Sequence, residues 1–144
     1  MKYFLIESEV AGGLGEHTKM DTSTHPPLVS ELHYVFEGWS DDALLTSFPC
    51  FIVTSKAKQL FEEAQFTGLS FDVVETSKSD NFIELYPAKV IPEFSWLKIS
   101  GGAGVDDFWI DKNCLIISER VLDVLLELGL QEAIITEFEI AGPE

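Results

Sequence analysis

Two segments of the chain share one pattern of apolar and polar positions. The first begins at Cys50 and reads CFIVTSKAKQLFEEAQFTGLSFDVVE. The second begins at Cys114, 64 residues later, and reads CLIISERVLDVLLELGLQEAIITEFE without a gap. In each segment a short apolar run ends in a hydroxyl residue, Thr54 or Ser118, which can accept hydrogen bonds from the first free amides of a helix. The pattern therefore predicts a strand, a capped helix and a second strand, twice.

The two predicted helices differ in how much of their surface is apolar. In the first, Ala57, Leu60 and Phe61 form a narrow stripe at helical spacing. In the second, residues 121–128 are apolar around most of the circumference, so we expect this helix to be the better buried one. Gly129 stands where a left-handed residue would end it.

The rest of the chain predicts further strands joined by polar segments. Residues 8–30 contain clusters of glycine and proline, which predict a long loop. Ser40-Asp41-Asp42 predicts the start of a short helical turn through Leu45. Strands are predicted at residues 3–6, 32–36, 71–75, 82–86, 96–99, 108–110 and 134–140.

Together these elements predict one domain over residues 1–144 of the α+β (mixed α/β) class. We expect a central, mostly antiparallel sheet with two main helices, built from two strand-helix-strand units. A chain of this length buries about 68–70% of the surface that it exposes when unfolded, which is enough for one core.

The charge of the chain is strongly negative. It carries 25 acidic residues against 9 basic ones, for a net charge of −16. Such a surface repels phosphate backbones, so we expect no nucleic-acid partner. The negative charge favours either solubility alone or attraction toward a basic partner protein. The apolar run at residues 3–6 is too short for a signal peptide, and no apolar run approaches a membrane span, so we expect a cytoplasmic protein without membrane contact.

Residue spacings give little support for catalysis. His17, His25 and His33 lack the spacings that place metal ligands on one face of a helix or turn, so we expect no metal and no cofactor. Cys50 and Cys114 lie in apolar runs, which favours buried thiols over a disulfide or a nucleophile. The glycine-rich segments 12–15 and 101–104 lack the residues that follow in phosphate-binding loops, and we interpret them as turns.

Two tryptophans stand among carboxylates and form the candidate partner-binding surface. Tryptophan at the centre of an interface with charge around it is a common arrangement of binding hot spots. The alternative is that both tryptophans belong to the core. The candidate residues are Glu37, Trp39, Asp41, Asp42, Asp106, Asp107, Trp109 and Asp111.

At Phe108-Trp109, followed by LIISERVLDVL at residues 115–125, the chain resembles the immunity proteins of bacterial polymorphic toxin systems. In particular it is similar to the family typified by a myxobacterial immunity domain, with its pattern Asp-Phe-Trp … Leu-Val-Ser-Glu-Arg … Leu. The resemblance is clearest over residues 48–140 and weakest over the first thirty. It implies a small cytosolic antidote that binds a cognate toxin domain. It assigns no catalytic and no interface residue.

Two hypotheses of function follow from the sequence. The favoured one is an antidote that neutralises a cognate, basic toxin protein through an acidic surface. The alternative is a small enzyme or small-molecule-binding domain, whose site would be assembled from residues 8–30 and 100–111. A flat acidic face would favour the first, and a pocket with converging histidines and carboxylates the second.

Overall fold

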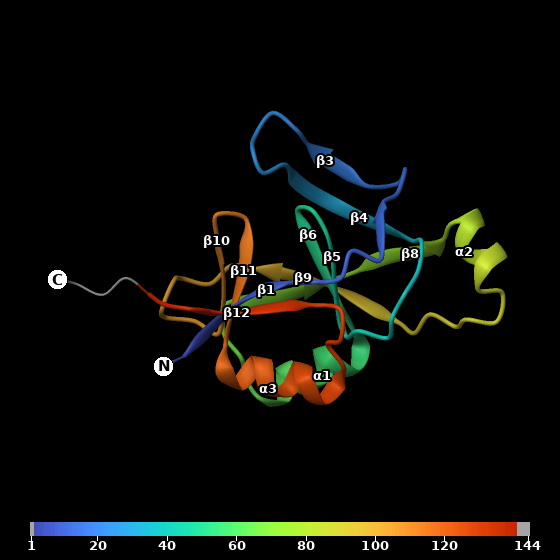
Figure 1. Ribbon diagram of the computed structural model, residues 1–144. Helices are drawn as coiled ribbons and strands as arrows, with labels where there is room; N and C mark the ends of the chain where they lie inside the picture. The colour runs from blue at the N-terminus through green and yellow to red at the C-terminus, as the bar shows by residue number, and fades with distance from the viewer. Residues whose placement is uncertain (1, 141–144) are drawn as a thin grey trace.

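A computed structural model describes residues 2–140, in which three helices and twelve strands form a single α+β fold (Figure 1). The class expected from the sequence is confirmed, with mostly antiparallel strand pairing. The helices are α1 (Ser55–Glu63), α2 (Asp80–Leu85) and α3 (Glu119–Leu128). The strands are β1 (Tyr3–Glu7), β2 (Gly12–Leu14), β3 (Lys19–Asp21), β4 (Leu28–Phe36), β5 (Leu44–Ser47), β6 (Cys50–Thr54), β7 (Leu69–Asp72), β8 (Val74–Lys78), β9 (Phe94–Ile99), β10 (Phe108–Asp111), β11 (Cys114–Ser118) and β12 (Ile134–Phe138).

The described strands form three sheets of four strands, where the sequence predicted one central sheet. Two sheets have the orders β5-β6-β9-β7 and β10-β11-β1-β12, and all of their pairs are antiparallel. In the third, β4 pairs with β2 and β3 in antiparallel fashion and with β8 in parallel fashion.

The repeat predicted at an offset of 64 residues is present in the strand register. Leu44 pairs with Val53 across β5 and β6, and Phe108, 64 positions later, pairs with Ile117 across β10 and β11. The same offset relates β7 to β12, since Phe71 pairs with a residue of β9 and Ile135 with the matching residue of β1. We call β5-β6-α1-β7 with β9 the first unit, and β10-β11-α3-β12 with β1 the second unit.

The sheet of the first unit is the middle layer of the molecule. Because successive side chains of a strand point to opposite faces, Val53 packs toward the helices and Ile52 toward the third sheet. Figure 1 shows α1 and α3 side by side below the sheets, with β3 and β4 above them and α2 apart on the right. The third sheet therefore packs on the face of this layer that is opposite to the helices.

Three local predictions were wrong. Residues 82–85 lie in α2 and Tyr86 ends it, so there is no strand here; the Ser79 hydroxyl accepts a hydrogen bond from the amide of Phe82 and caps the helix. Residues 40–45 form no helical turn: the backbone of Asp41 is left-handed (φ 74°) and β5 begins at Leu44. Residues 8–30 are not one loop, because β2 and β3 lie there and take up the free edges of β4.

The predicted helix starts are correct in position, but only one is a side-chain cap. Thr54 Oγ1 accepts a hydrogen bond from the amide of Ala57 at 3.2 Å. Ser118 occupies the matching position in α3 and makes no such bond. Gly129 has a positive φ of 122° and ends α3. None of the helices within residues 2–140 has the length and apolar character needed to cross a membrane.

Candidate functional site

Three of the predicted partner-binding residues are buried, so their expected exposure is wrong. Trp109 is 2% exposed, Asp42 is fully buried and Asp107 is 5% exposed. Trp109 packs against Tyr3 and Phe138 on the face of the second unit's sheet that points away from the helices. These side chains stabilise the fold and are not available to a partner at the surface.

Asp107 is the centre of a saturated hydrogen-bond network. Its carboxylate accepts from Nε and Nη2 of Arg120 at 2.9 and 2.8 Å, and from Ser118 Oγ at 2.7 Å. It also accepts from the amide of Thr67 at 2.9 Å. The hydrogen bonds from Arg120 and, to a lesser extent, those from Ser118 and Thr67 hold the pKa of Asp107 well below its ordinary value, although burial raises it. The network accounts for the Asp-Phe-Trp and Ser-Glu-Arg motifs as structural elements.

Asp42 has a comparable structural role. Its two carboxylate oxygens accept from the amides of Gln131 and Glu132, at 2.6 and 2.9 Å, in the turn that follows α3. Trp39 is half-buried, and its indole N–H donates to the backbone carbonyl of Asp42. Trp39 therefore packs against the core as the alternative interpretation expected.

The other four predicted residues lie at the surface but do not form one face. Glu37 accepts from Ser79 Oγ, and Asp41 pairs with Lys89 at 2.9 Å. Asp106 and Asp111 are both half-buried: Asp106 precedes β10 and accepts from the amide of Gly102, and Asp111 is the last residue of β10. Trp39 and Trp109 belong to two different hydrophobic clusters, so the two acidic segments do not share a tryptophan-centred surface.

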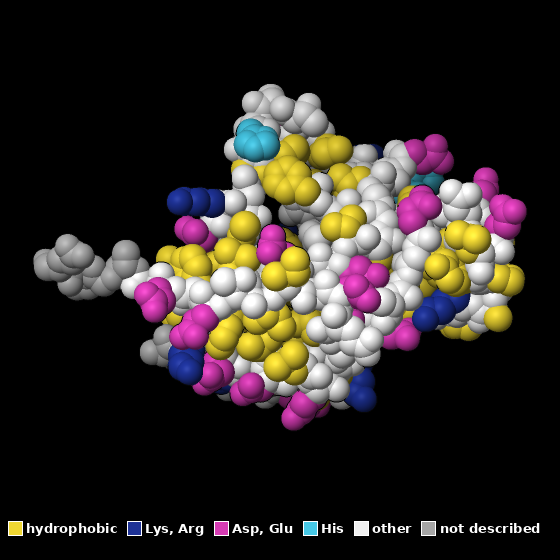
Figure 2. Space-filling model, viewed as in Figure 1, with side chains coloured by type: hydrophobic (Ala, Val, Ile, Leu, Met, Phe, Trp, Pro, Cys, Tyr) yellow, Lys and Arg dark blue, Asp and Glu magenta, His cyan; other side chains and the backbone are white. Residues whose placement is uncertain are grey.

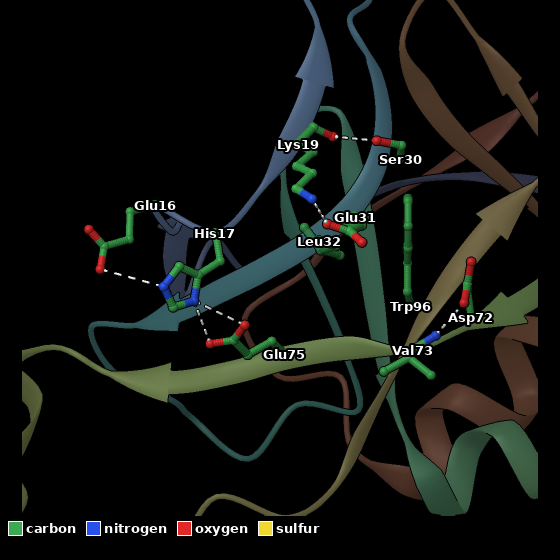
Figure 3. A pocket seen from close by; sticks show the side chains of 10 residues that line it. All are labelled: Glu16, His17, Lys19, Ser30, Glu31, Leu32, Asp72, Val73, Glu75 and Trp96. Atoms are coloured by element: carbon green, nitrogen blue, oxygen red, sulfur yellow. Dashed lines mark hydrogen bonds and ion pairs between the residues drawn. The ribbon is translucent and has the colours of Figure 1, made fainter.

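A groove of about 740 Å³ is lined by residues of β3 and β4 on one side and by residues of β7 and β8 on the other (Figure 3). We call it the acidic groove, because its lining has four carboxylates but only one lysine and one histidine. Its lining residues are Glu16, His17, Lys19, Ser30, Glu31, Leu32, Asp72, Val73, Glu75 and Trp96. Residues 8–30 therefore contribute to this site as the sequence-based alternative expected, whereas residues 100–111 do not.

Ion pairs cross the acidic groove and its rim. Lys19 Nζ lies 3.0 Å from Glu31, and His17 Nδ1 lies 2.8 Å from Glu75. Lys98 is not a lining residue, but its Nζ lies 4.7 Å from the centre of the Trp96 ring and 3.5 Å from Asp72. The lining side chains come mainly from strands, so the groove is held in shape by the sheets on either side of it.

At one end of the groove two histidines meet one glutamate. Because β4 and β8 are parallel neighbours with His33 opposite Glu75, the two side chains lie close, and the turn after β2 places His17 beside them. The two imidazole rings are stacked, with centroids 4.8 Å apart. The backbone of Gly15 lies against the His33 ring and leaves no room for a Cβ there. The hydrogen bond between His17 and Glu75 raises the pKa of His17 and lowers the pKa of Glu75.

Hydrogen bonds fix the orientation of His33, which is 6% exposed. Its Nδ1 accepts from the amide of His17 at 3.3 Å, so in the neutral ring the proton is on Nε2. Nε2 then donates to Ser77 Oγ at 2.8 Å and lies 3.6 Å from Glu75. This cluster was missed at the sequence level, because its members come from three segments and show no spacing typical of a metal site.

Other predicted features of the site chemistry have plain outcomes. Both cysteines are free thiols, as expected, with Cys50 buried and Cys114 half-buried. Burial raises the pKa of Cys50 to about 11, which makes it a poor nucleophile.

Residues 8–30 and 100–111 meet at a pocket of about 100 Å³, where Pro26 and Ile110 are lining residues and no ionisable group takes part. No protein-family model and no curated protein matches the chain.

Proposed function

We propose that this protein is a cytosolic antidote that binds and neutralises a cognate toxin domain, with the acidic groove receiving a basic segment of the toxin. The observation that carries the proposal is the lining of the groove, to which Glu16, Glu31, Asp72 and Glu75 contribute carboxylates. The groove is not a flat face and histidines converge at its end, which is the feature named above for a small-molecule site, so it is the excess of carboxylates together with the net charge of −16 that favours a basic protein partner. The proposal also draws on the resemblance of the Asp-Phe-Trp and Ser-Glu-Arg motifs to immunity proteins.

The lining suits a basic peptide segment that carries lysine or arginine. The exposed side chain of Val73 offers apolar contact to the stem of such a side chain, while the carboxylates of the lining attract its charged end. The net charge of −16 adds a long-range field of the same sign. Figure 2 shows carboxylates spread over the visible face between patches of hydrophobic side chains, so attraction is not confined to the groove.

The proposal is tested by survival of bacterial cells that express the toxin domain encoded beside this protein's own reading frame. Cells that produce the toxin alone should die, and cells that also produce this protein should grow. Purified toxin and antidote should form a complex in size-exclusion chromatography. Death in the presence of a folded, expressed antidote would reject the proposed function.

The groove is tested separately by matched charge reversals. Glu16→Lys with Glu31→Lys changes the groove, whereas Asp123→Lys with Glu127→Lys makes the same change of net charge on the exposed side of α3. We expect the groove pair to weaken binding by at least about tenfold and the α3 pair to weaken it by less than about threefold. Equal effects of the two pairs would place the toxin contact elsewhere on the protein.

Salt should act mainly on the rate of association. Raising the salt concentration from about 50 to about 500 mM shortens the screening length from about 13 to about 4 Å. We expect the association rate constant to fall by at least about tenfold and the dissociation rate constant to change little, as measured by surface plasmon resonance. An association rate constant that does not change with salt would contradict electrostatic attraction of the toxin, and solubility would then be the only role of the negative charge.

A further inference from the structure

Three potential metal ligands from distant segments converge at the end of the acidic groove. His17, His33 and Glu75 each offer one ligand atom, and these atoms lie within 4.8 Å of one another. Two of the three come from neighbouring strands in fixed register, β4 and β8, and the third from the turn after β2. Most of the site is therefore preformed by the fold.

We propose that His17, His33 and Glu75 bind a divalent transition-metal ion of the zinc type. Two imidazole nitrogens and one carboxylate oxygen are ligands that Zn²⁺ prefers, with a fourth position left for water or a partner's side chain. Ca²⁺ and Mg²⁺ favour sites made of oxygen alone, so the two histidines select against them. This inference goes beyond the proposed antidote function, and its test does not involve the toxin, although His17 and Glu75 also line the acidic groove.

The surroundings of the three side chains fit a bound cation. Figure 3 shows Glu16 and Glu75 on opposite sides of the His17 ring. On the other side of the ring from Glu75, Nε2 of His17 lies 3.7 Å from Oε1 of Glu16. Metal-bound histidines usually donate their second N–H to such a carboxylate, which fixes the ring and makes it a better ligand. Glu31 and Asp72 add negative charge along the groove.

Binding requires the His17 ring to turn and His33 to change its tautomer, which also removes the hydrogen bond from Nε2 of His33 to Ser77 Oγ. Because the two rings are stacked, their lone pairs do not point at a single position, and the exposed ring of His17 has to turn. A metal ion on Nε2 of His33 moves the ring proton to Nδ1, which breaks the contact with the amide of His17. The ion takes the place of the Nδ1 proton of His17 that faces Glu75, and in the neutral ring that proton moves to Nε2.

Calorimetric titration of the purified protein with Zn²⁺ tests the proposal. We expect one ion per chain, and a loss of affinity of at least about tenfold in His17→Ala and in Glu75→Gln. The third histidine supplies the matched control, because His25 is exposed and stands outside the cluster. His25→Ala should bind Zn²⁺ as the unchanged protein does. Visible absorption of bound Co²⁺ should be present in the protein and in His25→Ala, and absent in His17→Ala.

The choice of variants keeps the test independent of folding. His17 and Glu75 are both exposed, so their substitution should leave thermal unfolding nearly unchanged, whereas His33 is buried and its removal would disturb the third sheet. Absence of stoichiometric Zn²⁺ binding would overturn the proposal. Undiminished binding by folded His17→Ala would overturn it as well.

Discussion

The two repeated units share their strand register but begin their helices in different ways. In the first unit Thr54 caps α1 directly, whereas in the second the matching Ser118 turns its hydroxyl to Asp107. The position that matches Asp107, 64 residues earlier, is Ala43, which has no carboxylate to offer. One added carboxylate therefore changes the partner of a helix-capping residue without shifting the helix.

The comparison also shows how the units hold each other. Asp107 of the second unit accepts from the amide of Thr67 after α1, and Asp42 of the first unit accepts from the amide of Gln131 after α3. Thr67 and Gln131 are themselves 64 positions apart. Each unit thus supplies a buried carboxylate to the turn that follows the other unit's helix. Asp107 and Asp42 differ from the carboxylates of the acidic groove, because both are buried and already accept hydrogen bonds from other parts of the fold.

Removing one of these crossing carboxylates should have the largest effect on stability. Asp107→Ala leaves Ser118 Oγ and the amide of Thr67 without their buried acceptor, and we expect a loss of about 3 kcal/mol. Asp42→Ala should cost about 2 kcal/mol, since it removes two hydrogen bonds to backbone amides. Denaturant unfolding would measure both.

The matched control for these variants is Asp123→Ala, which removes an exposed carboxylate from α3. It should change the free energy of unfolding by less than about 0.5 kcal/mol. An Asp107→Ala protein as stable as this control would show that the network contributes nothing.

Lowering the pH should remove part of the stabilisation that Asp107 provides, and this effect should be smaller than the loss expected for Asp107→Ala. Its pKa is lowered in the folded state by the bonds from Arg120, so the unfolded state takes up the proton first as the pH falls. The stabilisation is full above the ordinary aspartate pKa of about 3.9 and is lost progressively below it. The difference in free energy of unfolding between the protein and Asp107→Asn should therefore narrow between about pH 5 and about pH 3. A constant difference would argue against the lowered pKa.

The smallest effects should come from the two hydroxyl residues at the helix starts. Thr54→Ala and Ser118→Ala should each cost about 1 kcal/mol, but through different partners. Combined with Asp107→Ala, the Ser118 change should add much less than it does alone, because its hydrogen-bond partner is already gone. The Thr54 change should add in full. Unfolding of the two double variants separates the cases, and full additivity of the Ser118 pair would contradict the network.

Much of the repeated architecture was predictable because its signals are local. The run of apolar residues that ends at Thr54 or Ser118, followed by apolar positions at helical spacing, defines a strand and a helix from neighbours alone. The helix α2 has a local signal as well, since Ser79 and Asp80 stand at its start, whereas the alternating pattern of residues 82–86 predicts a strand. Here the capping residue was the better guide.

The candidate site could not be predicted because it depends on long-range register. His33 and Glu75 are neighbours only through the parallel pairing of β4 with β8, and neither strand's sequence specifies that pairing. The burial of Trp109 had a similar cause: its hydrophobic contacts are with Tyr3 and Phe138, at opposite ends of the chain, so the carboxylates beside it in sequence suggested a surface position.

The central place of β1 in its sheet has a consequence for synthesis on the ribosome. Tyr3 pairs with Ser118 on one side and with Phe138 on the other, so both neighbours of β1 are made more than 100 residues after it. The strands of the first unit all lie between Leu44 and Ile99 and can pair while the chain is still growing. The second unit can close only after β12 has been synthesised, and until then β1 lacks at least one of its two strand partners.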